Sequence, residues 1–118
     1  MKGHRRQSKA QPEQKLVNAI LDWLKYHKIF AFRVRNGGTY DPTKKIWRLN
    51  TACRGISDII GILPRGKFMA LEVKTATGRV SEHQRDFLDM VAESGGFGAV
   101  IRSMEDLERL VMPFLKRA

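Results

Sequence analysis

Two carboxylates and a lysine stand at the ends of two short apolar segments of the chain. Asp58 opens one segment, and Glu72-Val73-Lys74 closes the next. In a β-strand successive side chains point to opposite faces, so Glu72 and Lys74 share one face while Val73 enters the core. Carboxylate oxygens hold hard divalent cations such as Mg²⁺, and a water on such a cation can attack phosphorus. The pattern indicates metal-dependent cleavage of nucleic acid.

Each candidate residue also has a purely structural explanation. An isolated Glu-x-Lys in a strand is commonly a salt bridge, in which Lys74 would neutralise Glu72. Glu13 shares the apolar face of a predicted helix and could reach the site, but an acid in a first turn also complements the helix dipole. Gln84 follows Ser81 at the spacing of a capping box. Three converging carboxylates and one lysine favour a metal site over these structural explanations, because one lysine cannot pair with three carboxylates.

The apolar pattern predicts the elements that bring these residues together. Helical spacing covers residues 12–28. Two buried strands, 58–63 and 68–74, are separated by a tight turn and should form an antiparallel hairpin at the centre of a sheet. In such a hairpin the start of one strand lies beside the end of the other, so we expect Asp58 and Glu72 to be neighbours.

A second hairpin is predicted between the first helix and the central strands. Alternation predicts strands over residues 30–35 and 46–50, paired with each other and joined by the turn-forming segment 36–43. Basic residues crowd this ribbon beside Tyr40 and Trp47, a pattern typical of a surface that follows a phosphate backbone. The candidate nucleic-acid contacts are Arg33, Arg35, Asn36, Lys44, Lys45, Arg48, Arg54 and Arg79.

The C-terminal third is predicted as helix, strand and helix. Ser81 begins the first helix, Gly95-Gly96 ends it, and residues 97–101 form a strand. Ser103 caps a last helix, which Pro113 should kink or divide. The apolar residues of this helix could form a subunit interface or cover the sheet, and we favour the covering role.

The composition points to a polyanionic partner. Among 118 residues, 22 Lys and Arg oppose 12 Asp and Glu, giving a net charge of +10 that attracts a phosphate backbone. Residues 1–11 are polar and basic and predict a flexible tail before a single domain over residues 12–118. A non-enzymatic nucleic-acid-binding module is the alternative. It explains the charge, but not acids on the face that would have to meet phosphate.

Other protein classes are not expected. Cys53 is the only cysteine, so neither an intrachain disulfide nor a cysteine-based zinc site can form. No apolar stretch approaches the roughly twenty residues that span a bilayer, and the N-terminus lacks the apolar core of a signal peptide. We expect a cytoplasmic protein with no membrane contact and no small-molecule cofactor.

Taken together, the motifs resemble those of the VRR-NUC domain, a branch of the PD-(D/E)xK nuclease superfamily. They are Gly55-Ile56-Ser57-Asp58, Glu72-Val73-Lys74, Gly78-Arg79 and Ser81-Glu82-His83-Gln84. The resemblance extends from Glu13 to about Leu115. Ser57 stands where many relatives have proline, which leaves the metal chemistry untouched.

The resemblance implies a fold and an activity. The fold would be α/β, with a central mixed sheet flanked by helices in the order αβββ(β)αβα, as in restriction endonucleases and Holliday junction resolvases. The activity would be Mg²⁺- or Mn²⁺-dependent hydrolysis of DNA phosphodiester bonds. The chain looks like the small stand-alone bacteriophage form, which tends to be a homodimer. We therefore expect an endonuclease for branched DNA in replication or repair, working in the cytoplasm of a bacterium or a phage host.

The resemblance also assigns residues to roles. Metal binding falls to the side chains of Glu13, Asp58 and Glu72 and to the backbone carbonyl of Val73. Catalysis falls to Lys74, with Asp58, Glu72 and Gln84, where Gln84 braces the site.

Overall fold

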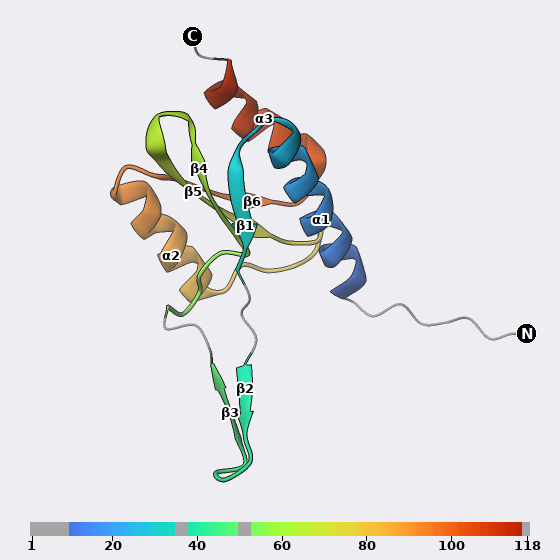
Figure 1. Ribbon diagram of the computed structural model, residues 1–118, viewed down its shortest axis with the longest axis vertical. Helices are drawn as coiled ribbons and strands as arrows, with labels where there is room; N and C mark the ends of the chain where they lie inside the picture. Colours follow the sequence, from blue (N-terminus) through green and yellow to red (C-terminus); the bar gives the residue numbers. More distant parts are fainter. Residues whose placement is uncertain (1–9, 35–37, 50–52, 117–118) are drawn as a thin grey trace, which may run out of the picture.

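A four-stranded sheet with helices on both faces forms the body of the protein (Figure 1). The computed structural model describes residues 10–34, 38–49 and 53–116. The elements, in chain order, are α1 (Ala10–Tyr26), β1 (Phe30–Arg33), β2 (Gly38–Asp41), β3 (Ile46–Leu49), β4 (Ile59–Leu63), a 3₁₀ turn (Pro64–Gly66), β5 (Lys67–Val73), α2 (Glu82–Glu93), β6 (Phe97–Ile101) and α3 (Met104–Leu115).

The sheet is mixed, as predicted. Its strand order is β1-β4-β5-β6, in which β4 is antiparallel to both β1 and β5, whereas β6 is parallel to β5. The central hairpin of β4 and β5 is therefore confirmed. Its register pairs Ile59 with Leu71, so the residues before the one and after the other, Asp58 and Glu72, meet at one end of the hairpin.

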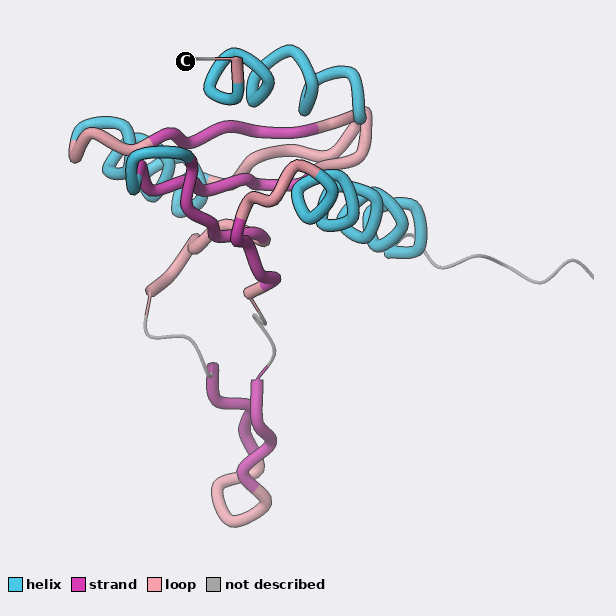
Figure 2. The backbone as a smooth tube through the Cα atoms, turned by 45° about the horizontal axis from the view of Figure 1, so that its top comes forward, coloured by secondary structure: helices cyan, strands magenta, loops and turns pink. Residues whose placement is uncertain are grey.

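The two faces of the sheet carry separate apolar clusters. One joins α1 and α3 to strand residues such as Leu71 and Val73, while the other joins α2 to Ile60 and Ala70. Figure 2 shows the resulting three layers, with the strands between the helices. Because side chains alternate along a strand, Glu72 lies on the same face as Ala70, which is the face that α2 covers.

The ends of α2 and α3 follow the predicted caps. The hydroxyl of Ser81 accepts a hydrogen bond from the Gln84 amide, and Ser103 caps α3 in the same way. Gly95 follows α2 with a φ of 94°, a conformation that glycine adopts without strain. Of the two predicted effects of Pro113, a kink or a division, the division is wrong, because α3 continues through Pro113 to Leu115. In a final turn, proline removes only one hydrogen bond.

The second predicted hairpin is paired differently. β1 pairs with β4 in the main sheet, and the chain then forms a separate two-stranded ribbon of β2 and β3 that projects from the body (Figure 1). We call this ribbon the arm. Its turn lies within residues 42–45, where the Asp41 side chain accepts hydrogen bonds from the amides of Thr43 and Lys44. This local turn closes a short hairpin, so five strands precede α2 within the described residues, where three or four were predicted.

The first helix starts earlier than predicted. α1 begins at Ala10, so the last two residues of the expected tail belong to the helix. Residues 1–9 lie outside the described part of the chain. None of the helices within the described ranges is both long and apolar enough to cross a membrane.

Candidate active site

The central hairpin brings Asp58, Glu72 and Lys74 together, as their spacing predicted. Asp58 Oδ2 accepts a hydrogen bond of 2.8 Å from the backbone amide of Val73, which attaches the start of β4 to the end of β5. Lys74 Nζ lies 3.6 Å from Glu72 Oε2. Val73 is fully buried in the opposite cluster. The alternation of one strand therefore separates a core residue from two charged neighbours.

Glu72 is a carboxylate in an unfavourable place for a negative charge. Glu72 is only 2 % exposed to solvent. Burial raises the pKa of Glu72 from 4.5 to about 8, and the charge of Asp58 is the next cause. A protonated Glu72 would also donate a hydrogen bond to Asp58, whereas Lys74 opposes the increase. Without a cation, the site therefore holds one negative charge in preference to two.

Glu72 presents two unlike oxygens to this environment. Oε2 accepts a hydrogen bond from Gln84 and faces Lys74. Oε1 is buried and has no hydrogen-bond partner among the described residues when both carboxylates are ionised. A buried, unpartnered carboxylate oxygen costs free energy, which either a proton shared with Asp58 or a bound cation would recover.

Gln84 makes two contacts, one with the cap of α2 and one with the acid of the site. Its side-chain oxygen accepts a hydrogen bond of 2.9 Å from the Ser81 amide, which completes the capping box of α2. Its side-chain nitrogen donates a hydrogen bond of 2.9 Å to Glu72 Oε2. The helix cap thus fixes the amide that orients the acid.

Glu13 does not join the acids of the hairpin. Its charge is the smallest of the influences that raise the pKa of Glu72. No three His, Cys, Asp or Glu side chains within the described ranges come close enough to hold a metal ion. The reason lies in the layers, because α1 packs on the face of the sheet opposite to α2. Glu13 therefore influences Glu72 through its charge and not through a contact that the structure records.

The hairpin acids nevertheless suit a hard cation. Asp58 and Glu72 offer carboxylate oxygens, the ligands that Mg²⁺ and Mn²⁺ prefer. The buried Oε1 of Glu72 has no described partner. A magnesium ion commonly uses one or two carboxylates and keeps several waters, so two acids are a sufficient protein contribution.

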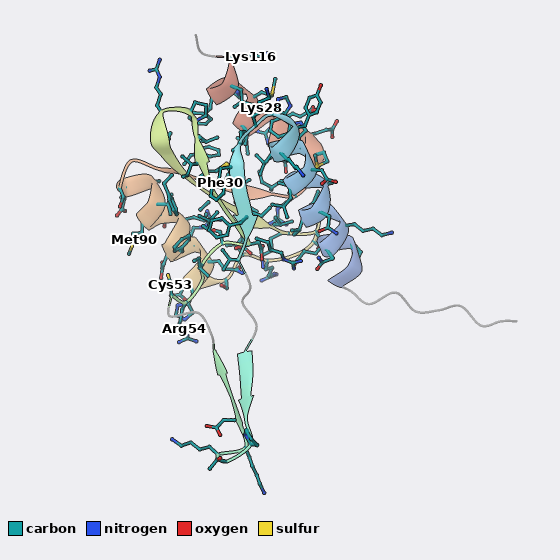
Figure 3. All side chains as sticks on the ribbon, in the orientation of Figure 1. Lys28, Phe30, Cys53, Arg54, Met90 and Lys116 are labelled. Atoms are coloured by element: carbon teal, nitrogen blue, oxygen red, sulfur yellow. The ribbon has the colours of Figure 1, made fainter. Side chains whose placement is uncertain are left out.

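The predicted nucleic-acid contacts are spread over several places. Lys44 and Lys45, which we call the tip lysines, are exposed at the end of the arm, and Arg33 is exposed at the end of β1. Arg79 is exposed in the loop before α2. Figure 3 shows Arg54 where the chain returns from the arm to the body. Arg35 and Asn36 lie outside the described residues, as does the side chain of Arg48.

Two further residues near the site escaped the sequence analysis. Gly55 has a φ of 77°, and a Cβ there would lie 2.2 Å from the backbone oxygen of His83. The loop before β4 therefore packs directly on the first turn of α2. Arg102 hydrogen-bonds the loop after Lys74. The glycine could have been suspected from the motif that ends at Asp58, but no sequence pattern marks the arginine.

Comparisons with known proteins agree with this fold. The sequence model of the VRR-NUC domain matches residues 9–105. A solved structure described as a VRR_NUC domain protein superposes with a TM-score of 0.61 at 17 % identity, and the match covers 92 % of each chain. No curated protein matches this chain.

Proposed function

Because the chain belongs to the VRR-NUC domain family, whose function is of the nuclease type, we propose that it is a metal-dependent DNA endonuclease. Asp58 and Glu72 would hold Mg²⁺ or Mn²⁺, together with the carbonyl of Val73. Glu13 would act on this cation from the strand ends. The observation that carries the proposal is the buried carboxylate of Glu72, with an unpartnered oxygen, beside the half-buried and repelling carboxylate of Asp58 at the end of the central hairpin.

A purely structural ion pair explains this arrangement less well. Lys74 supplies one positive charge at 3.6 Å, yet the pKa of Glu72 still rises to about 8. A stable fold does not require a buried acid beside a second acid, because an apolar pair of similar size would cost less free energy. A site that binds a cation and a phosphate does need such acids.

The side chains of the chain have distinct tasks in the proposed reaction. A bound cation would supply an activated water and neutralise charge on phosphate. Lys74, held beside Glu72, would orient the attacking water and offset the charge that develops on the phosphoryl oxygens. Gln84 keeps Glu72 Oε2 in place, which leaves the other oxygen free of that hydrogen bond. Hydrolysis forms a P–O bond to the oxygen of the attacking water and breaks the P–O bond to the leaving oxygen, which takes up a proton that the water gives up.

The basic residues of the body and arm would hold the DNA. The tip lysines, Arg33, Arg54 and Arg79 are exposed cations on separate elements. Contacts from such side chains to phosphates position a duplex without reading its bases. An arm that projects from the body could follow a second duplex segment, which supports a branched substrate over a simple linear one.

A cleavage assay with two single variants tests the chemistry. We expect Glu72→Ala and Lys74→Ala each to lower magnesium-dependent nicking of a labelled four-way junction by about a hundredfold or more. The control is Lys67→Ala, which removes a lysine from the opposite end of β5. A matched linear duplex measures structure selectivity. Unchanged cleavage in either site variant would rule out the proposal. DNA binding that weakens with salt, does not respond to a chelator and yields no cleavage product would indicate a non-enzymatic binding module.

The role of Glu13 needs its own comparison. In the proposal, Glu13→Ala raises the magnesium concentration needed for half-maximal cleavage and leaves DNA affinity unchanged. If Glu13 serves only the helix dipole, the variant lowers thermal stability and spares activity. Glu105→Ala is the matched control, because it removes an acid from the first turn of α3.

We also propose that the protein works as a homodimer, since resolving a junction requires two active sites. An exposed apolar stripe supports this. Phe30, Ile62 and Phe68 are register partners on three neighbouring strands, and they are 65 %, 49 % and 42 % exposed. Phe30 is labelled in Figure 3. Sedimentation should show a dimer that Ile62→Asp converts to a folded monomer, whereas a wild-type monomer at micromolar concentration refutes the idea.

A further inference from the structure

Arg102 ties together the loop that follows Lys74. It is the first residue after β6, and its Nη1 donates hydrogen bonds of 2.8 Å to the carbonyl of Thr75 and 2.7 Å to the carbonyl of Gly78. The carbonyl of Ala76 lies at 3.5 Å from the same nitrogen. Hydrogen bonds from a charged donor are stronger than neutral ones. One guanidinium nitrogen therefore contacts three backbone carbonyls of a single loop.

The loop that Arg102 holds lies against the lysine of the site. The amide of Lys74 donates to the carbonyl of Ile101, so the two strands part just beyond this bond. A Cβ on Gly78 would lie 3.4 Å from Lys74 Cδ and 3.3 Å from Thr75 Oγ1. The backbone at Gly78 thus forms one wall along the aliphatic part of the lysine.

Arg102 is itself anchored at the start of α3. Its backbone amide donates a hydrogen bond of 3.0 Å to Asp106 Oδ2. The other oxygen of Asp106 pairs with Arg109 at 3.0 Å, and the Asp106 amide donates to the Ser103 hydroxyl. Because α3 packs into the core through Leu107, the position of Arg102 is set by the body of the protein.

We propose that Arg102 is a positioning residue for Lys74. A lysine side chain has four rotatable bonds and loses conformational entropy when it is confined. The loop wall limits the directions open to this side chain, and Arg102 keeps the wall in place. Arg102 acts on the reaction through the loop and does not touch the substrate. The inference rests on the proposed nuclease function, since it concerns the same lysine.

Three variants test the inference. Arg102→Ala removes the clamp, and Arg102→Lys keeps the charge but not the guanidinium fork. Arg109→Ala is the matched control, because it removes an arginine from the other side of Asp106 without reaching the loop. Amide hydrogen exchange of residues 75–79 reports the loop directly. Single-turnover cleavage at saturating DNA, DNA affinity and the thermal midpoint report the consequences.

We expect a specific set of results. Arg102→Ala should speed exchange of the loop amides and lower the single-turnover rate by about ten- to a hundredfold, the scale of a small misplacement of a reacting group. Its DNA affinity should stay within about twofold of wild type, because no phosphate contact is lost. Arg102→Lys should recover part of the rate. Arg109→Ala should match wild type in both rate and loop exchange.

Other outcomes overturn the inference. Loop amides that exchange at the wild-type rate in Arg102→Ala show that the clamp does not order the loop. If Arg102→Ala loses much of its DNA affinity while its single-turnover rate is unchanged, Arg102 binds phosphate. If Arg102→Lys recovers the full single-turnover rate, the effect of Arg102 comes from its charge. A wild-type protein that cuts no DNA refutes the proposed function, while the exchange measurement still decides whether Arg102 orders the loop.

Discussion

Replacing Glu72 by glutamine should stabilise the metal-free protein increasingly as the pH rises. In the folded protein the pKa of Glu72 is about 8, against 4.5 as the ordinary value that applies after unfolding. Between these two values the folded state retains a proton that the unfolded state has released. The free energy of unfolding of the wild type therefore falls with rising pH across this window and reaches its full loss above about pH 8. Below 4.5 both states are protonated and the loss is absent.

The magnitude follows from the same interval. From 4.5 to about 8, at about 1.4 kcal/mol for each pH unit, the wild type loses about 5 kcal/mol of stability through this group. Glutamine carries no charge at any pH, and its oxygen can still accept the hydrogen bond from Gln84 that Glu72 accepts at 2.9 Å. The amide nitrogen can donate to Asp58. The variant should therefore gain about 5 kcal/mol on the wild type between about pH 5 and pH 9.

Urea unfolding of the two proteins at a series of pH values, with chelator present, measures this gain. Glu108→Gln is the control, because it removes an exposed acid from α3 and should show no comparable trend. Millimolar Mg²⁺ at high pH should stabilise the wild type and leave Glu72→Gln unchanged, since only the wild type offers the second carboxylate. A stability difference that stays flat with pH would refute the view of Glu72 as an acid strained by burial.

Three other predictions concern the surroundings of the site. Gly55→Ala should cost at least about 2 kcal/mol in urea unfolding, because its Cβ would meet backbone at 2.2 Å, whereas Gly66→Ala, at a φ of 76° in open space, should cost only about 1 kcal/mol. Ser81→Ala and Gln84→Ala should each lose about 1 kcal/mol of stability through the helix cap, but only Gln84→Ala should also slow cleavage, because it alone loses the bond to the acid. Replacing both tip lysines with alanine should weaken DNA binding and lower the salt slope by about 2 while the single-turnover rate is unchanged, and an unaltered slope would exclude the arm from phosphate contact.

The hairpin at the centre of the site was predictable because its determinants are local. Apolar residues over 58–63 and 68–74 surround a Pro-Arg-Gly turn, and such a pattern allows only one register of the two strands. Strand alternation then separates Val73 from Glu72 and Lys74. The capping box of α2 was equally visible, because it depends on two residues three positions apart.

The strand over residues 30–35 was predicted with the wrong partner, because strand pairing beyond a tight turn is not local. Residues 30–33 carry an alternation that fits either neighbour, and they pair with β4 because this placement extends the buried sheet. The two halves of the arm then close on each other through the turn that begins at Asp41. Propensity identified strands in this region but could not choose between these pairings.

The sequence by itself determined which residues could do chemistry and brought the acids of one hairpin to the same end, since alternation and turn residues act over a few positions. Only the tertiary structure decided that Glu13 acts on Glu72 more weakly than Asp58 does, because α1 covers the other face of the sheet. It also decided that Arg102, 28 positions after Lys74 in the chain, orders the loop beside that lysine. Parallel pairing of β5 with β6 makes such distant residues neighbours, and no local pattern records that contact.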